Sequence, residues 1–189
     1  MNFKTIVHSK ESFKTSRWSG GETCELFISP PGSDFSKREF LFRISSAAVE
    51  VPDSVFSSFA GYTRYITVLE GSIELCHKGH HDITLLPYDV DRFDGSWNTK
   101  SRGCCIDFNF IFKSELQGKM KITDADKGHS KEYTCNRIFV YCHLKNISVT
   151  LNNKTVALEK GCLLEIENPH GEPINLSIAE CSSIIIMSI

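Results

Sequence analysis

The sequence predicts an all-β protein, a sandwich or barrel built from short strands. Almost every apolar stretch alternates with a period of two residues, which places successive side chains on opposite faces of a strand. Runs rich in Gly, Pro and Asn separate these stretches at regular intervals, as turns do in sandwiches and barrels. No long stretch has the 3.6-residue period of a helix, and we expect only one helical turn, near Phe56–Ala60.

The alternation identifies the individual strands. Residues 38–51 form one candidate, with Phe40, Phe42 and Ile44 on the face opposite to Leu41, Arg43 and Ser45. Residues 64–75 predict a strand, a tight turn and a second strand. Residues 104–112 place Asp107 and Asn109 on the face opposite to Phe108, Phe110 and Phe112. Further strands are expected within 82–86, 137–144, 148–153, 155–167 and 174–189.

The distribution of polar residues suggests two lobes. Residues 113–134 are charged and poor in large apolar side chains, so we expect them to connect an N-terminal lobe, residues 1–112, to a C-terminal β lobe, residues 135–189. Because 189 residues divide into two rather small cores, we expect the second lobe to pack on the first as a single compact unit.

Composition excludes several classes of protein. The 21 basic and 23 acidic residues give a net charge of −2, and Lys and Arg are scattered, so we expect no nucleic-acid partner. No apolar run approaches the roughly 20 residues of a membrane span, and the N-terminus lacks the apolar stretch of a secretory signal, so we expect a cytoplasmic protein without a membrane partner. The C-terminal run, residues 183–189, is either a covered strand or an edge strand through which two copies would form a homodimer.

The cysteines show no C-x-x-C pair, and most lie within apolar alternation. In a chain without a secretory signal we expect them to be free thiols rather than disulfides or zinc ligands. They are Cys24, Cys76, Cys104, Cys105, Cys135, Cys142, Cys162 and Cys181.

One segment contains residue types that bind metals. His77, His80, His81 and Asp82 crowd a glycine-centred turn, and metal binding needs ligands that converge from stiff elements, so we expect a solvated polar turn. The chain also lacks a nucleophile elbow, a P-loop and a dinucleotide fingerprint. We therefore expect no metal and no cofactor, and assign no catalytic residue.

Polar residues within apolar strands are more informative. Arg43, Arg64, Asp107 and Asn109 all interrupt apolar sheet sequence, and a buried charge is costly unless it is paired. One account is an internal Arg–Asp pair that stabilises the fold. The other is a polar patch whose guanidinium groups bind the carboxylate of a small acid. The concentration of such residues in one half of the chain favours the second account.

Five blocks in this half resemble successive motifs of the HutD/Ves family. They are WSGGETCEL (18–26), FLFRISSAAV (40–49), FSSFAGYTRYITVLEGSIEL (56–75), RFDG (92–95) and DFNFIF (107–112). The resemblance implies a cupin-like β-barrel with two fused lobes, a bicupin. It also implies an association with bacterial histidine utilisation or, in the Ves branch, with a stress response. For the histidine-pathway members it implies a regulatory protein that senses a metabolite such as N-formylglutamate or urocanate.

The resemblance also bears on the site. Arg64 stands where the metal-binding histidine cluster of ordinary cupins begins, which implies a metal-independent pocket for anions. The expected function is therefore a carboxylate-binding protein that regulates histidine or amino-acid catabolism. The expected ligand-binding residues are Arg43 and Arg64 as carboxylate grips, Asp107 and Asn109 as hydrogen-bonding partners, Trp18 and Phe93 as apolar wall, and Glu25.

Two alternatives remain open. One is an isomerase or lyase that uses Glu25 and Asp107 as an acid/base pair, which a raised carboxyl pKa and a closed pocket would favour. The other is a structural or interaction protein without a ligand, whose Arg–Asp pairs are internal braces. We expect a binding protein rather than an enzyme.

Overall fold

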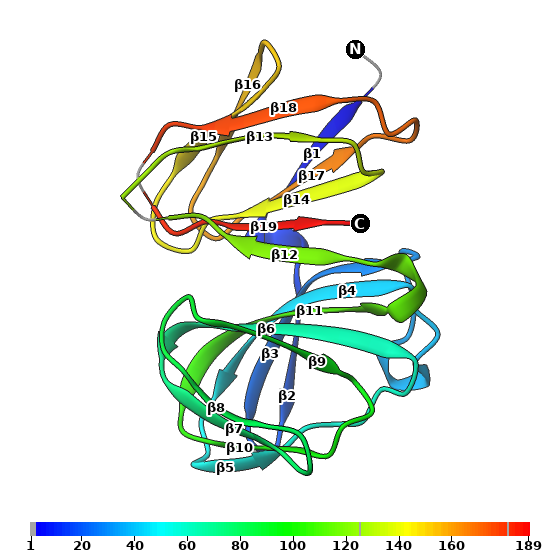
Figure 1. Cartoon of the computed structure of the whole chain (residues 1–189), viewed down its shortest axis with the longest axis vertical. Helices are drawn as coiled ribbons and strands as arrows, with labels where there is room; N and C mark the ends of the chain where they lie inside the picture. Colours follow the sequence, from blue (N-terminus) through cyan, green and yellow to red (C-terminus); the bar gives the residue numbers. More distant parts are fainter. Residues whose placement is uncertain (1–2, 125, 181) are drawn as a thin grey trace. The chain divides into compact units, whose positions relative to one another are not determined.

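The computed structural model describes residues 3–124, 126–180 and 182–189 and confirms the all-β fold (Figure 1). The chain divides into two compact units, one of Phe13–Gln117 and one of Met1–Ser12 with Gly118–Ile189. Helical structure in the described residues is limited to three single-turn 3-10 helices: η1 (Lys10–Ser12), η2 (Phe35–Lys37) and η3 (Ser114–Leu116).

The helical turn expected near Phe56–Ala60 is wrong. The four residues 56–59 are irregular and residue 60 begins a turn. The backbone N–H of Phe59 donates to the carbonyl of Gly95, and this long-range bond takes the place of the local bond that a helix needs. The segment instead forms part of the wall of the cavity described below.

The unit Phe13–Gln117 contains two antiparallel sheets. The larger has the order β2–β3–β4–β11–β6–β9, and its strands are β2 (Lys14–Trp18), β3 (Gly21–Ser29), β4 (Phe42–Val49), β6 (Tyr62–Gly71), β9 (Val90–Asp94) and β11 (Cys105–Lys113). The smaller has the order β5–β10–β7–β8, and its strands are β5 (Asp53–Val55), β7 (Ile73–His77), β8 (Asp82–Leu85) and β10 (Thr99–Arg102). Both sheets contribute to one apolar core, for example Ile66 and Val68 from β6 with Leu75 and Leu85 from β7 and β8.

The described residues of the other unit also form two antiparallel sheets. One has the order β1–β17–β14–β19–β12, with β1 (Lys4–His8), β12 (Lys119–Ile122), β14 (Arg137–Tyr141), β17 (Leu163–Glu167) and β19 (Ile185–Ser188). The second has the order β13–β18–β15–β16, with β13 (His129–Tyr133), β15 (Ile147–Leu151), β16 (Lys154–Leu158) and β18 (Ile174–Ile178). Fully buried side chains from both, such as Val140 and Leu176, form its core.

The structure divides the chain differently from the expected boundaries of 1–112, 113–134 and 135–189. The first strand, β1, pairs with β17 of the C-terminal unit. The segment expected to be a connection supplies two strands, β12 and β13, which pair with β19 and β18. Both are short and polar, and most of their side chains are exposed or partly exposed, so they lack the apolar alternation that would identify them in the sequence.

The strand–turn–strand expected over 64–75 connects two sheets. β6 pairs with β11 and β9, whereas β7 pairs with β10 and β8, so the two strands do not pair with each other. Gly71 lies at the corner with φ of 81°, and a Cβ there would lie 2.8 Å from the carbonyl oxygen of Cys104. Glycine therefore allows the chain to pass from one sheet to the other.

The C-terminal run is a covered strand. β19 lies between β14 and β12, and pairs with both, so the alternative of an exposed edge at this strand is wrong. Its side chains Ile185, Ile186 and Met187 are buried. A homodimer through this edge is therefore not supported, because the strand has no free edge to offer.

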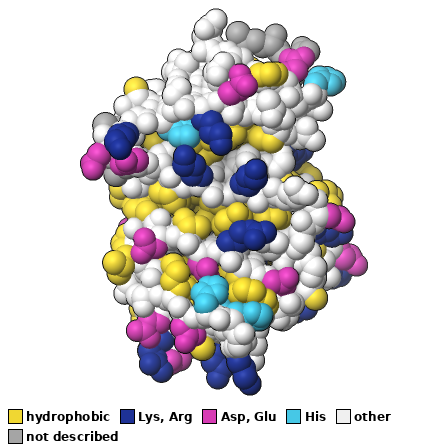
Figure 2. All heavy atoms as spheres, viewed as in Figure 1, with side chains coloured by type: hydrophobic (Ala, Val, Ile, Leu, Met, Phe, Trp, Pro, Cys, Tyr) yellow, Lys and Arg dark blue, Asp and Glu magenta, His cyan; other side chains and the backbone are white. Residues whose placement is uncertain are grey.

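Two observations concern the nucleic-acid and membrane partners that were not expected from the composition. On the face shown in Figure 2, acidic side chains lie among Lys and Arg in both units. None of the short helices in the described part of the chain is long or apolar enough to cross a bilayer.

The seven described cysteines are free thiols, and Cys181 lies outside the described residues. Cys76 and Cys104 are exposed, whereas Cys105 is buried and burial raises its pKa to about 12. We expect denatured, unreduced protein to titrate eight thiols. In the native protein the exposed pair should react with a thiol reagent before the buried Cys105, Cys142 and Cys162, because burial limits access and, at Cys105, also disfavours the reactive thiolate. Disulfides recovered from protein made in a reducing cytosol would contradict this prediction.

Candidate functional site

The inner face of the larger sheet brings the predicted polar residues together. In the register of β11 with its neighbours, Ile111 lies opposite Arg43 of β4 and Arg64 of β6. Two residues earlier, Asn109 lies opposite Ser45, and two earlier again Asp107 lies opposite Ala47. Since alternate residues share a face, these side chains all point to the same side of the sheet. The phenylalanines of β11 lie on the other side, as predicted.

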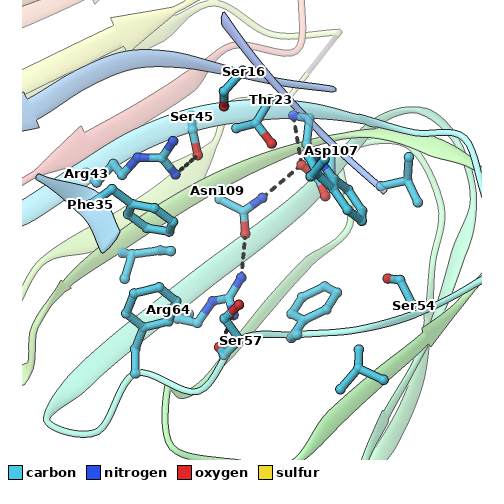
Figure 3. A pocket seen from close by; sticks show the side chains of 17 residues that line it. Ser16, Thr23, Phe35, Arg43, Ser45, Ser54, Ser57, Arg64, Asp107 and Asn109 are labelled. Carbon is cyan, nitrogen blue, oxygen red and sulfur yellow. Dashed lines mark hydrogen bonds between the residues drawn. The ribbon is translucent and has the colours of Figure 1, made fainter. Parts of the chain in front are cut away.

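These residues line a cavity of about 340 Å³ within the unit Phe13–Gln117 (Figure 3). The sheet side supplies the polar groups, with Ser16, Thr23 and Ser45 beside the two arginines. The segment that follows β5 forms much of the remaining wall and is mainly apolar. The lining residues are Ser16, Trp18, Thr23, Phe35, Arg43, Ser45, Ala47, Val49, Ser54, Val55, Phe56, Ser57, Phe59, Arg64, Asp107, Asn109 and Ile111.

Arg43 is an internally paired cation. Its Nε donates to Glu25 Oε2 at 2.7 Å, and one terminal nitrogen donates to Ser45 Oγ at 3.0 Å. Its guanidinium carbon lies 4.0 Å from the ring centroid of Phe35, within the range of a cation–π contact. Both charged side chains are largely buried, with 7% of Arg43 and 15% of Glu25 exposed. The charge of Arg43 is therefore balanced within the protein.

Arg64 is a buried cation without a matching anion in contact. One terminal nitrogen donates to Asn109 Oδ1 at 3.2 Å and the other to the carbonyl of Ser57 at 3.4 Å, while its buried Nε has no hydrogen-bond partner among the described residues. No described carboxylate forms an ion pair with it, and aromatic rings of Phe56, Phe59 and Phe93 surround the guanidinium at 4.7–5.8 Å. Burial lowers the pKa of Arg64 to about 10, against the opposing effect of Asp107. The side chain still carries its charge at neutral pH.

Asp107 is the buried carboxyl of the site. Its Oδ1 accepts hydrogen bonds from the backbone N–H of Ala47 at 3.1 Å and from Asn109 Nδ2 at 2.8 Å. Asn109 thus bridges the carboxyl and Arg64. Burial raises the pKa of Asp107 to about 7, even though the Ala47 N–H and the Arg64 charge both favour the ionised form. A carboxyl with this pKa exchanges protons near neutral pH.

The charges of the cavity favour an anion. The Arg43–Glu25 pair is neutral as a whole, Arg64 is positive, and Asp107 is only partly ionised near pH 7. The cavity therefore holds an excess of positive charge in a setting of low dielectric, where an added carboxylate gains both charge and hydrogen-bonding partners.

The lining does not fit a resident transition metal of the kind that cupins often hold. It contains no histidine or cysteine among the described residues, and two guanidinium groups would repel a cation. The donor groups of this cavity therefore suit an anion better than a transition metal.

Five of the seven predicted site residues line the cavity. Glu25 and Phe93 lie behind it, Glu25 as the ion-pair partner of Arg43 and Phe93 with its ring 5.1 Å from the guanidinium carbon of Arg64. The interpretation of Trp18 as apolar wall agrees with its place in the lining, although 41% of it is exposed.

Three of the rings that contact the guanidiniums were missed as site residues, whereas Phe93 was predicted. Phe35, Phe56 and Phe59 lie between strands, where periodicity carries no information, and the segment Phe56–Ala60 was expected to form only a helical turn. The one available signal was the density of phenylalanine in loops that flank the arginine strands.

The fold and the cavity define a cupin-like protein with an anion-compatible pocket. The sequence matches the HutD family over residues 10–185, and the chain belongs to that family. An uncharacterised 21.2 kDa protein in the hutC 3′ region of Pseudomonas putida is 39% identical over 123 residues, which cover 62% of this chain and 63% of that protein's length.

Solved structures show the same fold over nearly the whole chain. HutD from Pseudomonas fluorescens SBW25, in a formate condition, has a TM-score of 0.80 at 22% identity, and the match covers 98% of this chain and 97% of the HutD chain. A conserved protein of unknown function from Pseudomonas aeruginosa PAO1 has a TM-score of 0.84 at 20% identity, with 97% of each chain covered. The Escherichia coli pirin YhhW, in complex with nickel(II), has a TM-score of 0.67 at 11% identity, and the match covers 98% of this chain and 99% of the YhhW chain.

Proposed function

We propose that this protein binds a small carboxylate metabolite in the cavity of the unit Phe13–Gln117 and acts as a metal-independent regulatory binding protein in the cytoplasm. The ligand carboxylate contacts the guanidinium of Arg64. Asn109 holds that guanidinium in place, and the phenylalanines around it exclude water. The Arg43–Glu25 pair forms one polar side of the cavity and keeps its own charge balanced.

The state of Arg64 carries this proposal. A buried arginine normally has a carboxylate partner, because desolvation of an unpaired guanidinium is costly. Here Nε is buried without a hydrogen-bond partner among the described residues, and the nearest buried carboxyl, Asp107, is reached only through Asn109. An external carboxylate would supply the missing anion and would form charge-assisted hydrogen bonds.

The relatives suggest which metabolite to try first. The chain belongs to the HutD family, and a relative lies in the hutC 3′ region of Pseudomonas putida. On this basis we propose a role in histidine or amino-acid catabolism, with N-formylglutamate and urocanate as the first candidates. The cavity of about 340 Å³ has room for a ligand of this size.

A second candidate function has one observation in its favour. Burial raises the pKa of Asp107 to about 7, as a general acid or base in an isomerase or lyase would require. Glu25, the partner that such a mechanism would use, forms an ion pair with Arg43 and does not line the cavity. The binding function is therefore the better supported of the two.

A thermal-shift screen that compares each carboxylate with its amide tests the proposal. We expect formate, urocanate or N-formylglutamate to raise the melting temperature in a saturable manner. The corresponding amides should not, because they lack the negative charge. Prolonged incubation of the stabilising compound with the protein, followed by NMR of the compound, distinguishes a binding protein from an enzyme. A compound that is recovered unchanged supports binding, and turnover supports the isomerase or lyase. If no carboxylate of this set shifts the transition beyond its amide, the proposal fails.

A further inference from the structure

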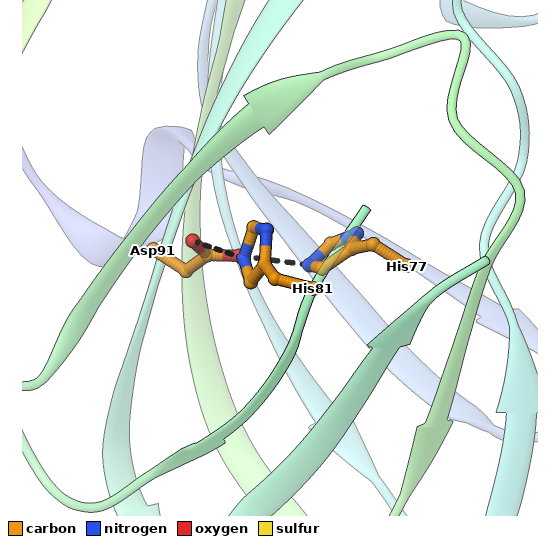
Figure 4. A group of neighbouring side chains, drawn as sticks. All are labelled: His77, His81 and Asp91. Atoms are coloured by element: carbon orange, nitrogen blue, oxygen red, sulfur yellow. Dashed lines mark hydrogen bonds and ion pairs between the residues drawn. The ribbon is translucent and has the colours of Figure 1, made fainter. Parts of the chain in front are cut away.

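A second group of polar side chains lies apart from the cavity, where the two sheets of the unit Phe13–Gln117 meet. His77 ends β7 in the smaller sheet, His81 lies in the turn that follows, and Asp91 belongs to β9 of the larger sheet (Figure 4). His77 Nε2 lies 2.8 Å from Asp91 Oδ2, and His81 Nε2 lies 3.1 Å from Asp91 Oδ1. One ligand atom from each residue lies within 4.8 Å of the other two.

This group differs from the one that the sequence suggested. His80, His81 and Asp82 are neighbours in the chain, but the ring of His80 stacks on Trp97 at 3.7 Å and Asp82 is not in the group. The third residue, Asp91, comes from another strand, ten positions after His81. The objection that one turn cannot supply converging ligands therefore does not apply, because β9 provides a stiff second element.

The surroundings orient His77 as a ligand. Its side chain is fully buried, and its Nδ1 is hydrogen-bonded to Thr99 Oγ1 at 2.8 Å, which leaves Nε2 facing Asp91. Metal-binding histidines commonly use the second nitrogen in this way, and such partners fix the ring orientation. The rings of Phe93 and Trp97 pack against His77 and restrict it further. His81, 39% exposed, leaves a path from solvent.

We propose that His77, His81 and Asp91 bind a divalent first-row transition ion. Two imidazoles and one carboxylate suit such ions. With metal–ligand distances of about 2.1 Å, neighbouring ligands are about 3.0 Å apart around an octahedral ion and about 3.4 Å around a tetrahedral one. His77 and His81 contact different oxygens of Asp91, at 2.8 and 3.1 Å, and one ligand atom from each of the three residues lies within 4.8 Å of the other two. Modest side-chain shifts would therefore bring both imidazoles and one carboxylate oxygen to a shared ion, with water at the open positions on the side of His81. For this site, the proposal replaces the expectation of a metal-free protein.

Cobalt(II) is the probe for the test, because its d–d absorption reports coordination number. We expect untagged wild-type protein, stripped with chelator, to bind one equivalent of Co²⁺ by calorimetry. The d–d spectrum should change on binding and report the coordination number, and the melting temperature should rise with Co²⁺ concentration. His81→Ala, at a partly exposed position, should fold normally and lose at least tenfold in affinity.

His80→Ala is the matched control, since it removes the adjacent histidine that lies outside the group. It should bind Co²⁺ as the wild type does. The proposal is overturned if the wild type binds no Co²⁺, if His81→Ala binds as tightly as the wild type, or if His80→Ala loses as much affinity as His81→Ala.

Discussion

Replacing Arg64 with methionine should abolish stabilisation by carboxylates and leave the ligand-free protein close to wild-type stability. A ligand at 100 times its dissociation constant adds about 2.7 kcal/mol to the native state, a shift of roughly 5–11 °C for a chain of this size. Methionine keeps the length of the buried stem but removes the charge. Because no described carboxylate forms an ion pair with Arg64, we expect the free energy of unfolding to change by no more than about 1 kcal/mol. Thermal and urea unfolding, with and without the carboxylate, measure both quantities.

The lysine variant separates charge from geometry. Arg64→Lys keeps a positive charge at this position but lacks the planar fork that binds a carboxylate through two parallel hydrogen bonds. We expect it to retain only a small part of the carboxylate-induced shift. If Arg64→Met still shows the full carboxylate-induced rise in melting temperature, Arg64 does not bind the carboxylate. A loss of about 3–5 kcal/mol in the ligand-free methionine variant would instead identify Arg64 as an internal brace.

Arg43→Met is the matched control for these experiments. Arg43 contacts Glu25 at 2.7 Å, so its removal leaves a largely buried carboxylate without its cation. We expect this variant to lose about 3 kcal/mol in the absence of ligand, unlike Arg64→Met. The two arginines are alike in sequence context, and the contrast would show that only one of them is held for an external anion.

The strand pattern allowed much of the fold to be predicted, and its failures have physical causes. The alternation in β4, β6 and β11 is strong because one face of each strand is apolar, and all three were recognised. β12 and β13 were missed since most of their side chains are at least partly exposed, which removes the alternation. The pairing of β1 with β17 joins residues that are far apart in the chain, and local periodicity carries no information about such contacts.

The candidate site shows the same division between local and long-range information. Arg43, Arg64, Asp107 and Asn109 were identified because polar residues in apolar strands violate the local pattern. That Glu25 pairs with Arg43, and that Asn109 separates Asp107 from Arg64, depends on the register between strands. The same limitation hid the His77–His81–Asp91 group, whose third member lies on a strand of the other sheet.

Asp107→Asn should make the ligand-free protein more stable at pH 8 and leave its stability at pH 4 little changed. Burial raises the pKa of Asp107 to about 7, compared with about 3.9 in an unfolded chain. The folded protein therefore holds this proton more tightly than the unfolded chain, and the associated stability is present below about pH 4. It is lost as the pH rises towards 7. The full difference corresponds to roughly 4 kcal/mol.

Asparagine is the suitable replacement because its amide oxygen can still accept from the Ala47 N–H and from Asn109 Nδ2. Urea unfolding of both proteins between pH 4 and pH 8 gives the test. The variant's advantage over the wild type should grow by roughly 4 kcal/mol across this range. Asp34→Asn is a control of opposite sign, because hydrogen bonds from Ser36 lower the pKa of Asp34. The free energy of unfolding of that variant should fall relative to the wild type as the pH rises. Parallel curves for Asp107→Asn and the wild type would show that Asp107 ionises in the folded protein as it does in the unfolded chain, and would remove the support for acid/base chemistry at this carboxyl.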